Sequence, residues 1–133
     1  LESGMMIVHY VAAASLAEMH GRTSPRSAFS TPTSGGQEDH VSMGATACWN
    51  LVETCKHLSE VLACELLIAC EALEYRVAEP AEHVSGLYKM VRKISEPLTR
   101  DRATSNEIEE IAKQLRNGGW LARIEAEYGR LPR

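Results

Sequence analysis

The sequence predicts an all-α protein made of a few unequal helices, one of them unusually long. Apolar residues recur at steps of three and four along most of the chain, which is the period of an amphipathic helix. No segment shows the sustained apolar/polar alternation of a half-buried strand, so no strand is expected. Aromatic residues are only 5% of the 133 residues, so the core is expected to consist of Leu, Ile, Val, Ala and Met.

The first helix is expected over residues 1–21. Ser3 is a residue type that often caps a helix N-terminus, and Gly21 is a typical residue at a C-terminal stop. Between them the apolar residues from Met5 to Met19 follow the helical period. No Lys or Arg precedes this apolar stretch, so it is not expected to be a signal peptide.

Residues 22–39 are expected to form a loop, because Ser, Thr, Gly and Pro dominate them. Loops of this length often carry function. Glu38, Asp39 and His40 follow at the expected start of the next helix. Carboxylates there are favoured by the helix dipole and by free backbone N–H groups, so residue types alone favour a capping role over a catalytic one.

The second helix is expected over residues 40–78, ending ahead of Pro80, with a length of ~57 Å. Its first half is apolar on one side only. From Val61 to Leu73 it is apolar almost all round, interrupted by Glu65 and Glu71. Such a helix needs neighbours on every side, and one other long helix cannot supply them. We therefore expect the chain to be a piece of a larger helical assembly.

Residues 80–133 are expected to form a tail of short helices. The apolar period predicts one helix over 81–94, ended by Pro97. A second is expected from Thr104 or Ser105 to the glycines at 118–119, and a last amphipathic turn begins at Trp120.

Composition and cysteine spacing exclude several classes of function. The net charge is −4 and the pI near 5.7, with no basic stripe, so nucleic acid is not an expected partner. No apolar run approaches the roughly 20 residues that span a bilayer. The four cysteines lie seven, nine and six residues apart on one expected helix, which suits neither a metal site nor a disulfide. A reduced, cytoplasmic protein without a metal is expected.

One run in this sequence resembles a known family. Residues 37–44 resemble a signature of the aromatic amino acid lyases, which eliminate ammonia with a methylidene-imidazolone electrophile, and most closely that of the histidine ammonia-lyases. The resemblance covers about residues 1–78 and implies that residues 1–133 form a single C-terminal helical segment of a larger lyase. It is carried by Gln37-Glu38-Asp39-His40-Val41-Ser42-Met43-Gly44, by Ser3-Gly4-Met5-Met6-Ile7, Ser24-Pro25 and Pro32-Thr33-Ser34 upstream, and by Val61-Leu62-Ala63 and Glu65-Leu66-Leu67 downstream.

The resemblance implies a long-helix bundle in a homotetramer whose active sites each draw residues from three subunits. It implies that Glu38 is a catalytic and substrate-binding residue that contacts the substrate side chain, and that Met6 lies on the pocket wall. Phenylalanine and tyrosine enzymes usually carry Gln at the position of Glu38, and plant phenylalanine enzymes place Lys and Glu at those of Met6 and Ser34. These three residues therefore argue against the plant phenylalanine type. A carboxylate also suits an imidazole, because it can accept a hydrogen bond from the ring or pair with the protonated ring. Asp39 and His40 are expected to orient the helix start.

The family's electrophile forms from an Ala-Ser-Gly triad, and this sequence contains none. The resemblance therefore implies that an N-terminal part of the enzyme supplies the triad and that this chain alone is inactive. The implied reaction converts L-histidine to urocanate.

Two alternatives stay open. The first is a tyrosine or phenylalanine ammonia-lyase, or an aminomutase, of the same family. It stays open because Gly35-Gly36 stands where histidine enzymes tend to have Ala-Asn. A non-catalytic helical oligomerisation or scaffold chain is the other.

Overall fold

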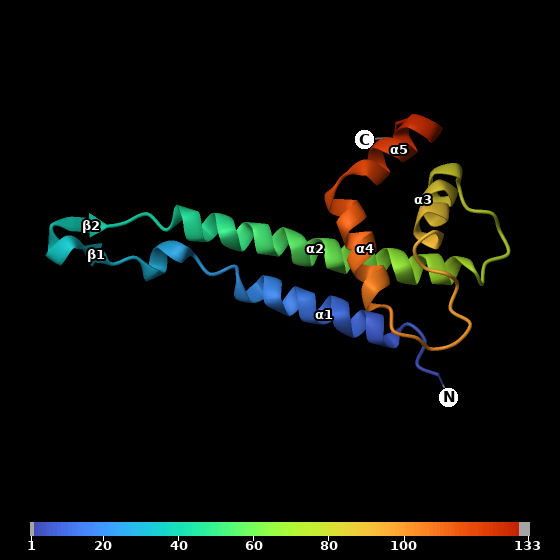
Figure 1. Cartoon of the computed structure of the whole chain (residues 1–133), viewed down its shortest axis with the longest axis horizontal. Coiled ribbons are helices and arrows are strands. Elements are labelled where there is room, and N and C mark those ends of the chain that lie inside the picture. Colours follow the sequence, from blue (N-terminus) through green and yellow to red (C-terminus); the bar gives the residue numbers. More distant parts are fainter. Residues whose placement is uncertain (1, 131–133) are drawn as a thin grey trace.

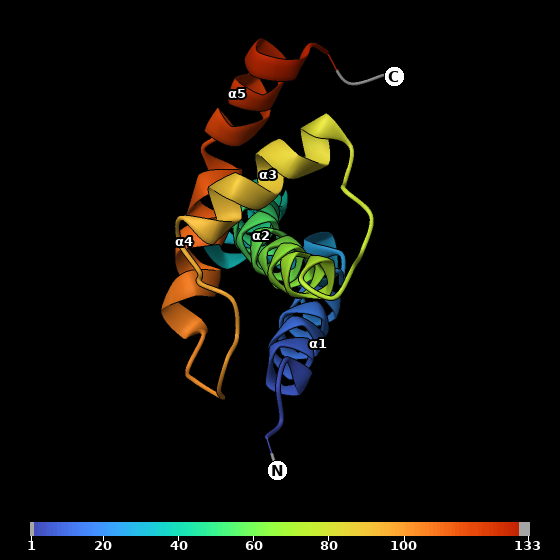
Figure 2. The ribbon, with the colours of Figure 1, turned by 90° about the vertical axis from the view of Figure 1, so that its right-hand side faces the viewer.

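The computed structural model describes residues 2–130 and confirms the all-α prediction. Helices α1 and α2 run antiparallel, and the segment between them projects beyond both as a narrow arm (Figure 1). Helices α3 and α4 pack against the C-terminal half of α2, and α5 packs against α3 and α4 (Figure 2). In chain order the elements are α1 Met6–Gly21, η1 Arg26–Phe29, β1 Pro32–Thr33, η2 Ser34–Gly36, β2 Glu38–His40, α2 Gly44–Leu73, α3 Glu82–Arg92, α4 Ser105–Arg116 and α5 Gly119–Tyr128.

The core lies where α1, α2, α3 and α4 meet. On α2 the buried residues recur at helical spacing, and Leu67 is completely buried. Val91 of α3 and Ile111 of α4 close over it, also completely buried. The chain's own short helices thus cover much of the stretch of α2 that is apolar all round. Leu62, Ala69 and Ala72 of that stretch stay exposed, so the expectation that this chain cannot cover it on every side holds in part. The core residues are Val8, Ala63, Cys64, Leu67, Cys70, Val91, Ile108, Ile111 and Ala112.

Large apolar side chains are left uncovered on α1 and on α2 up to Leu62. They include Met6, Ile7, Tyr10, Val11, Leu16, Trp49, Leu51, Val52, Leu58 and Leu62. Apolar surface of this kind marks interaction sites in folded proteins. The chain therefore has an unpartnered apolar surface that begins earlier on α2 than its sequence indicates and reaches into the predicted stretch only at Leu62.

The four cysteines are free thiols and divide into two pairs. Cys64 and Cys70 are buried in the core, where they act as the small apolar side chains expected. Burial raises the pKa of the Cys70 thiol to about 11. Cys48 and Cys55 are exposed on the uncovered half of α2.

The first helix begins at Met6, and Ser3 is not its side-chain cap. The carboxylate of Asp101 accepts hydrogen bonds from Ser3 N at 2.6 Å and from Gly4 N at 2.8 Å. A negative charge at this end also suits the helix dipole. The connector before α4 therefore anchors the two residues that lead into α1, a contact that no local pattern could indicate.

The second helix begins at Gly44, later than predicted, because residues 38–40 pair with β1 as a strand. Ser42 Oγ accepts from Gly44 N at 3.2 Å at the helix start. Asp39 and His40 therefore do not cap α2, and Asp39 Oδ1 instead accepts from His40 N at 2.8 Å within the strand. Strands of two and three residues are too short to show an alternating pattern, which explains why they were not predicted.

The second helix ends at Leu73, before the predicted position 78, and the tail follows the predicted order of short helices. Gly118 has a left-handed backbone (φ 68°) between α4 and α5, as its place at a helix stop predicts. Residue 1 of the first predicted helix and residues 131–133 of the predicted tail lie outside the described residues.

A buried ion pair fixes α3 against the end of α2. Arg92 Nη2 lies 3.0 Å from Glu71 Oε2, and the two side chains are only 10% and 9% exposed. Arg92 also donates to the Cys70 carbonyl oxygen and lies 2.8 Å from Glu74 Oε1. Glu71 Oε1 accepts from Leu98 N at 3.0 Å, so one carboxylate joins α2, α3 and the connector that follows.

Arg92→Met is expected to destabilise the chain by about 3–5 kcal/mol, because it leaves the Glu71 carboxylate buried without a cation. Urea unfolding followed by circular dichroism measures this loss. Arg100→Met, at an exposed position, is the control and should change stability little. A loss at Arg92 no larger than that of the control would show that the pair does not hold α3 in place.

The Tyr88–Glu74 hydrogen bond should make stability depend on pH. Tyr88 Oη donates to Glu74 Oε1 at 2.5 Å. This bond holds the pKa of Glu74 below its ordinary value of 4.5 and raises that of Tyr88 above its ordinary 10.0. Its contribution is therefore present between these values and is lost as pH falls through the lowered pKa of Glu74 or rises through the raised pKa of Tyr88.

Tyr88→Phe should lower the Tm at pH 7, and the difference from the unmodified chain should shrink above pH 10.0 and below pH 4.5. Thermal unfolding across that range measures it. A difference that stays constant with pH would contradict a role for this bond.

Candidate functional site

The polar run that the sequence singles out lies on the arm beyond α1 and α2. Strand β2 carries Glu38 and pairs antiparallel with β1, so that Thr33 lies opposite Glu38. Thr33 Oγ1 donates to Glu38 Oε2 at 3.1 Å. The Glu38 carboxylate is otherwise exposed, at the far end of the molecule from the core (Figure 1).

The tip of the arm has a backbone that few residues adopt without strain. Ser34, Gly35 and Gly36 all have positive φ, at 53°, 65° and 84°. Glycine adopts this region freely, whereas serine does so at a cost. Gln37 N donates to the Ser34 carbonyl oxygen at 3.2 Å and closes the turn directly before Glu38. The turn thus sets where the Glu38 side chain emerges.

Two sets of contacts hold the arm, one between its two sides and one to helix α2. The Ser30 carbonyl oxygen accepts from His40 Nδ1 at 3.1 Å, and Ser30 Oγ donates to the Val41 carbonyl oxygen at 2.6 Å. Nearer the helices, Arg26 Nη2 donates to the amide oxygen of Asn50 on α2 at 2.7 Å. His40 therefore holds the two sides of the arm together, which is a structural role.

Met6 and Glu38, the two residues expected to line one pocket, lie toward opposite ends of helix α1. Met6 begins α1 near the N-terminus and is 51% exposed, whereas Glu38 lies on the arm beyond the other end of α1 (Figure 1). Helix α1 alone separates them by roughly 24 Å. Within one chain the structure does not bring them together.

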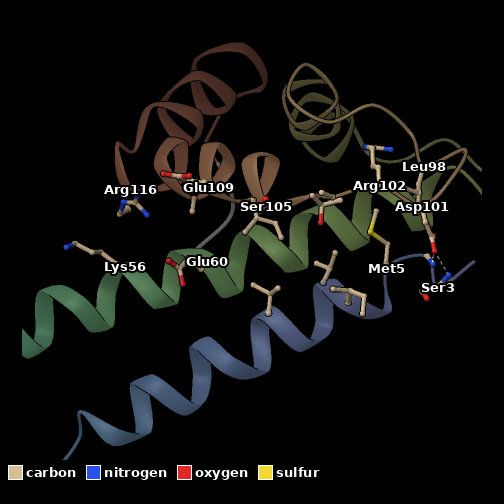
Figure 3. Close-up of a pocket in the computed structure, with 18 residues that line it drawn as sticks. Ser3, Met5, Lys56, Glu60, Leu98, Asp101, Arg102, Ser105, Glu109 and Arg116 are labelled. Atoms are coloured by element: carbon tan, nitrogen blue, oxygen red, sulfur yellow. Dashed lines mark hydrogen bonds between the residues drawn. The ribbon is translucent and has the colours of Figure 1, made fainter.

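A groove of about 680 Å³ lies elsewhere, between α1, α2, α4 and the connector before α4 (Figure 3). Sequence reasoning did not indicate it, because its walls come from segments far apart in the chain. The exposed apolar residues Ile7 and Val11 of α1 are the only local signal.

The described residues contain neither a metal site nor a membrane-spanning helix. Between residues 2 and 130 no group of three or more His, Cys, Asp or Glu side chains could hold a metal ion. In the same range no helix is both long and apolar enough to cross a bilayer.

Two long antiparallel helices joined by a polar arm and flanked by short helices define an all-α protein with an exposed polar site. The chain belongs to the aromatic amino acid lyase family, whose model matches residues 1–95. It is similar to the histidine ammonia-lyase of Symbiobacterium thermophilum, with 39% identity over 98% of this chain and 26% of that enzyme. That of Shouchella clausii is 37% identical over 93% of this chain and 25% of its own length.

A solved structure supports the same relationship. The structure of histidine ammonia-lyase from Trypanosoma cruzi matches with a TM-score of 0.86 and 34% identity, over 95% of this chain and 25% of that chain. The family resemblance expected from residues 37–44 is thus confirmed. The chain spans about a quarter of the length of the relatives it matches.

Ser34→Gly is expected to stabilise the arm by about 1 kcal/mol, because glycine adopts the positive φ of 53° without strain. Slower hydrogen exchange of the Gln37 amide, which closes the turn, measures the gain. Ser27→Gly, in the short helix η1, is the control and should give no such protection. Faster exchange at Gln37 in Ser34→Gly would mean that Ser34 stabilises the turn.

Proposed function

We propose that this chain acts as the C-terminal portion of a histidine ammonia-lyase-like enzyme that eliminates ammonia from L-histidine to give urocanate. The observation that carries the proposal is similarity over nearly the whole chain to proteins named histidine ammonia-lyase, at 37% and 39% identity. The Glu38 carboxylate, presented at the end of the arm, agrees with it. The proposed compartment is the cytoplasm, where the exposed thiols of Cys48 and Cys55 would stay reduced.

In this proposal Glu38 binds the imidazole of the substrate and takes part in proton transfer. Its carboxylate accepts one hydrogen bond, from the Thr33 hydroxyl at 3.1 Å, and can accept further hydrogen bonds. An imidazole N–H or imidazolium can therefore donate to it. Thr33 and the turn at Ser34 hold the carboxylate in place, so that little side-chain entropy is lost on binding.

The separation of Met6 from Glu38 supports a pocket shared between subunits. If a second copy lies antiparallel to the first, the Met6 end of one chain meets the arm of the other. The apolar residues exposed on α1 and the first half of α2 would be covered by such packing. This agrees with the proposed homotetramer, in which Met6 borders the pocket that contains Glu38 of another copy.

The family uses a methylidene-imidazolone group, and the residues of this chain do not fit it. The group forms from Ala-Ser-Gly, which the sequence lacks. Ser85-Gly86 lies inside helix α3, with Gly86 packed against the Tyr128 ring, and Val84 precedes it. We therefore derive no step through the electrophile for this chain. The proposed enzyme needs an N-terminal part that contains the triad.

One observation favours a second substrate class. Gly35 and Gly36 both have positive φ, a region that the Ala of histidine enzymes would occupy only under strain. The tip of the arm can therefore differ in shape from that of histidine enzymes. A tyrosine or phenylalanine lyase, or an aminomutase, is the alternative that this difference supports. A scaffold role is the alternative supported by the lack of the triad.

The proposal is tested in a chimera in which this chain replaces the matching quarter of the Symbiobacterium thermophilum enzyme. The chimera should release urocanate from L-histidine, measured by its ultraviolet absorbance. Glu38→Gln should lower kcat/KM by about 10²–10⁴-fold, the range for a residue that both binds and transfers protons. Glu79→Gln, in the exposed turn after α2, is the control and should leave kcat/KM unchanged.

Three outcomes would contradict the proposal. Unchanged turnover of histidine by the Glu38→Gln chimera would remove Glu38 from the site. Faster release of coumarate or cinnamate from tyrosine or phenylalanine would favour the alternative substrates. A folded tetrameric chimera that is inert to all three amino acids would favour the scaffold role.

A further inference from the structure

The arm between α1 and α2, residues 22–43, is not fixed by core packing. None of these residues, all of which the structure describes, is buried. Its two strands are only two and three residues long, and its two short 3-10 helices have no buried side chain. The arm nevertheless presents Glu38 far from the core (Figure 1). Its direction therefore depends on specific contacts with the helices.

Most hydrogen bonds between the arm and the helices are local. Thr23 Oγ1 donates to a carbonyl oxygen in the last turn of α1, and Ser42 Oγ accepts from the first N–H of α2. Contacts so close to a junction leave the rest of the arm free to turn about it. Within residues 2–130, only the hydrogen bonds between Arg26 and Asn50 join the arm to a helix across more than four residues of sequence.

Arg26 makes this contact with two of its guanidinium donors. Nη2 donates to the amide oxygen of Asn50 on α2 at 2.7 Å, and Nε donates to the same oxygen. The guanidinium also lies over the Phe29 ring, with Cζ 5.7 Å from the ring centroid, which is within cation–π range. Lysine has neither the forked donors nor the planar group for these contacts. One side chain thus joins α2 to both ends of η1.

The contacts continue from η1 to the strand that contains Glu38. Ser30 follows η1 directly, and its carbonyl oxygen accepts from His40 Nδ1 at 3.1 Å. Ser30 Oγ donates to the Val41 carbonyl oxygen at 2.6 Å. On the same two sides of the arm, Thr33 Oγ1 donates to Glu38 Oε2 at 3.1 Å. Because these contacts run from α2 through η1 to β2, a shift of η1 on α2 would move Glu38 with it.

We propose that Arg26 is a positioning residue, which fixes η1 on α2, sets the direction of the arm and thereby places the Glu38 carboxylate in the shared pocket. This inference rests on the proposed function, in which Glu38 binds the imidazole of the substrate. A misplacement of about 1 Å can lower the rate of an enzyme about 10²-fold. An anchor at the base of the arm therefore affects turnover, although Arg26 acts only through Glu38.

The first measurement is the distance between α2 and the tip of the arm in the full chain. Nitroxide labels on the exposed native Cys48 and on Gln37→Cys, in a Cys55→Ser background, report it by pulsed electron paramagnetic resonance. The other two thiols are buried and stay unlabelled. Arg26→Met should broaden the distribution of distances, because η1 loses its contact with α2. Arg123→Met, at an exposed position on α5, is the control and should leave the distribution unchanged.

The second measurement is histidine turnover by the chimera with the Symbiobacterium thermophilum enzyme. Arg26→Met should lower kcat/KM about tenfold to hundredfold. Asn50→Asp keeps an acceptor for the guanidinium and adds a charge to it, so kcat/KM should stay at the level of the unmodified chimera or rise. In the Glu38→Gln chimera, Arg26→Met should have little further effect, because the carboxylate that it positions is gone. A merely structural role would lower turnover equally in both backgrounds.

Failure of the inference is distinguishable from failure of the proposed function. An unchanged distribution of distances in Arg26→Met would overturn the anchor whatever the activity. An equal loss of turnover from Arg26→Met with and without the Glu38 carboxylate would overturn the positioning role. Absence of urocanate from the unmodified chimera would contradict the proposed function, and the distance measurement would still decide whether Arg26 fixes the arm.

Discussion

The structure depends on the ion pair between Glu71 and Arg92. Because both side chains are almost completely buried, their charges are stabilised by each other, by Glu74 beside Arg92, and by a few fixed hydrogen bonds. Through Leu98 N the same carboxylate fixes the connector after α3. The connector in turn presents Asp101 to the start of α1. One buried carboxylate on α2 therefore determines how α3, the connector and α1 are placed relative to one another.

This constraint divides the molecule into two regions with different roles. Around the end of α2, short helices and the ion pair make a dense core that the chain completes by itself. Beyond the core, α1, the first half of α2 and the arm expose large apolar side chains and the Glu38 carboxylate. A rigid core that supports an exposed arm is a suitable way to deliver a side chain into a site shared with other polypeptides. The region with exposed apolar side chains is thus also the region that contains the candidate site residue Glu38.

The family resemblance and the physical argument support each other at different places. The polar run around Glu38 indicates the family from the sequence alone, and similarity over most of the chain confirms it. The apolar surface of α2 also predicts an incomplete molecule, but the prediction locates the exposed surface only in part. Most of residues 61–73 are covered by α3 and α4, which lie against α2, although Leu62 stays exposed; the apparently ordinary stretch around Leu51 and Leu58 is exposed as well.

The sequence by itself determined the helical class, the order of the helices, the stop at Gly118 and the family, because these depend on local periodicity and on a contiguous run of residues. Only the tertiary structure decided what depends on distant partners. Ser3 does not cap α1 with its side chain; instead its backbone N–H donates to the carboxylate of Asp101, 98 residues away. Residues 38–40 form a strand rather than a helix start, since β1 satisfies their backbone. Met6 and Glu38 lie far apart because helix α1 separates them. This separation is a consequence of helix geometry that residue types do not encode.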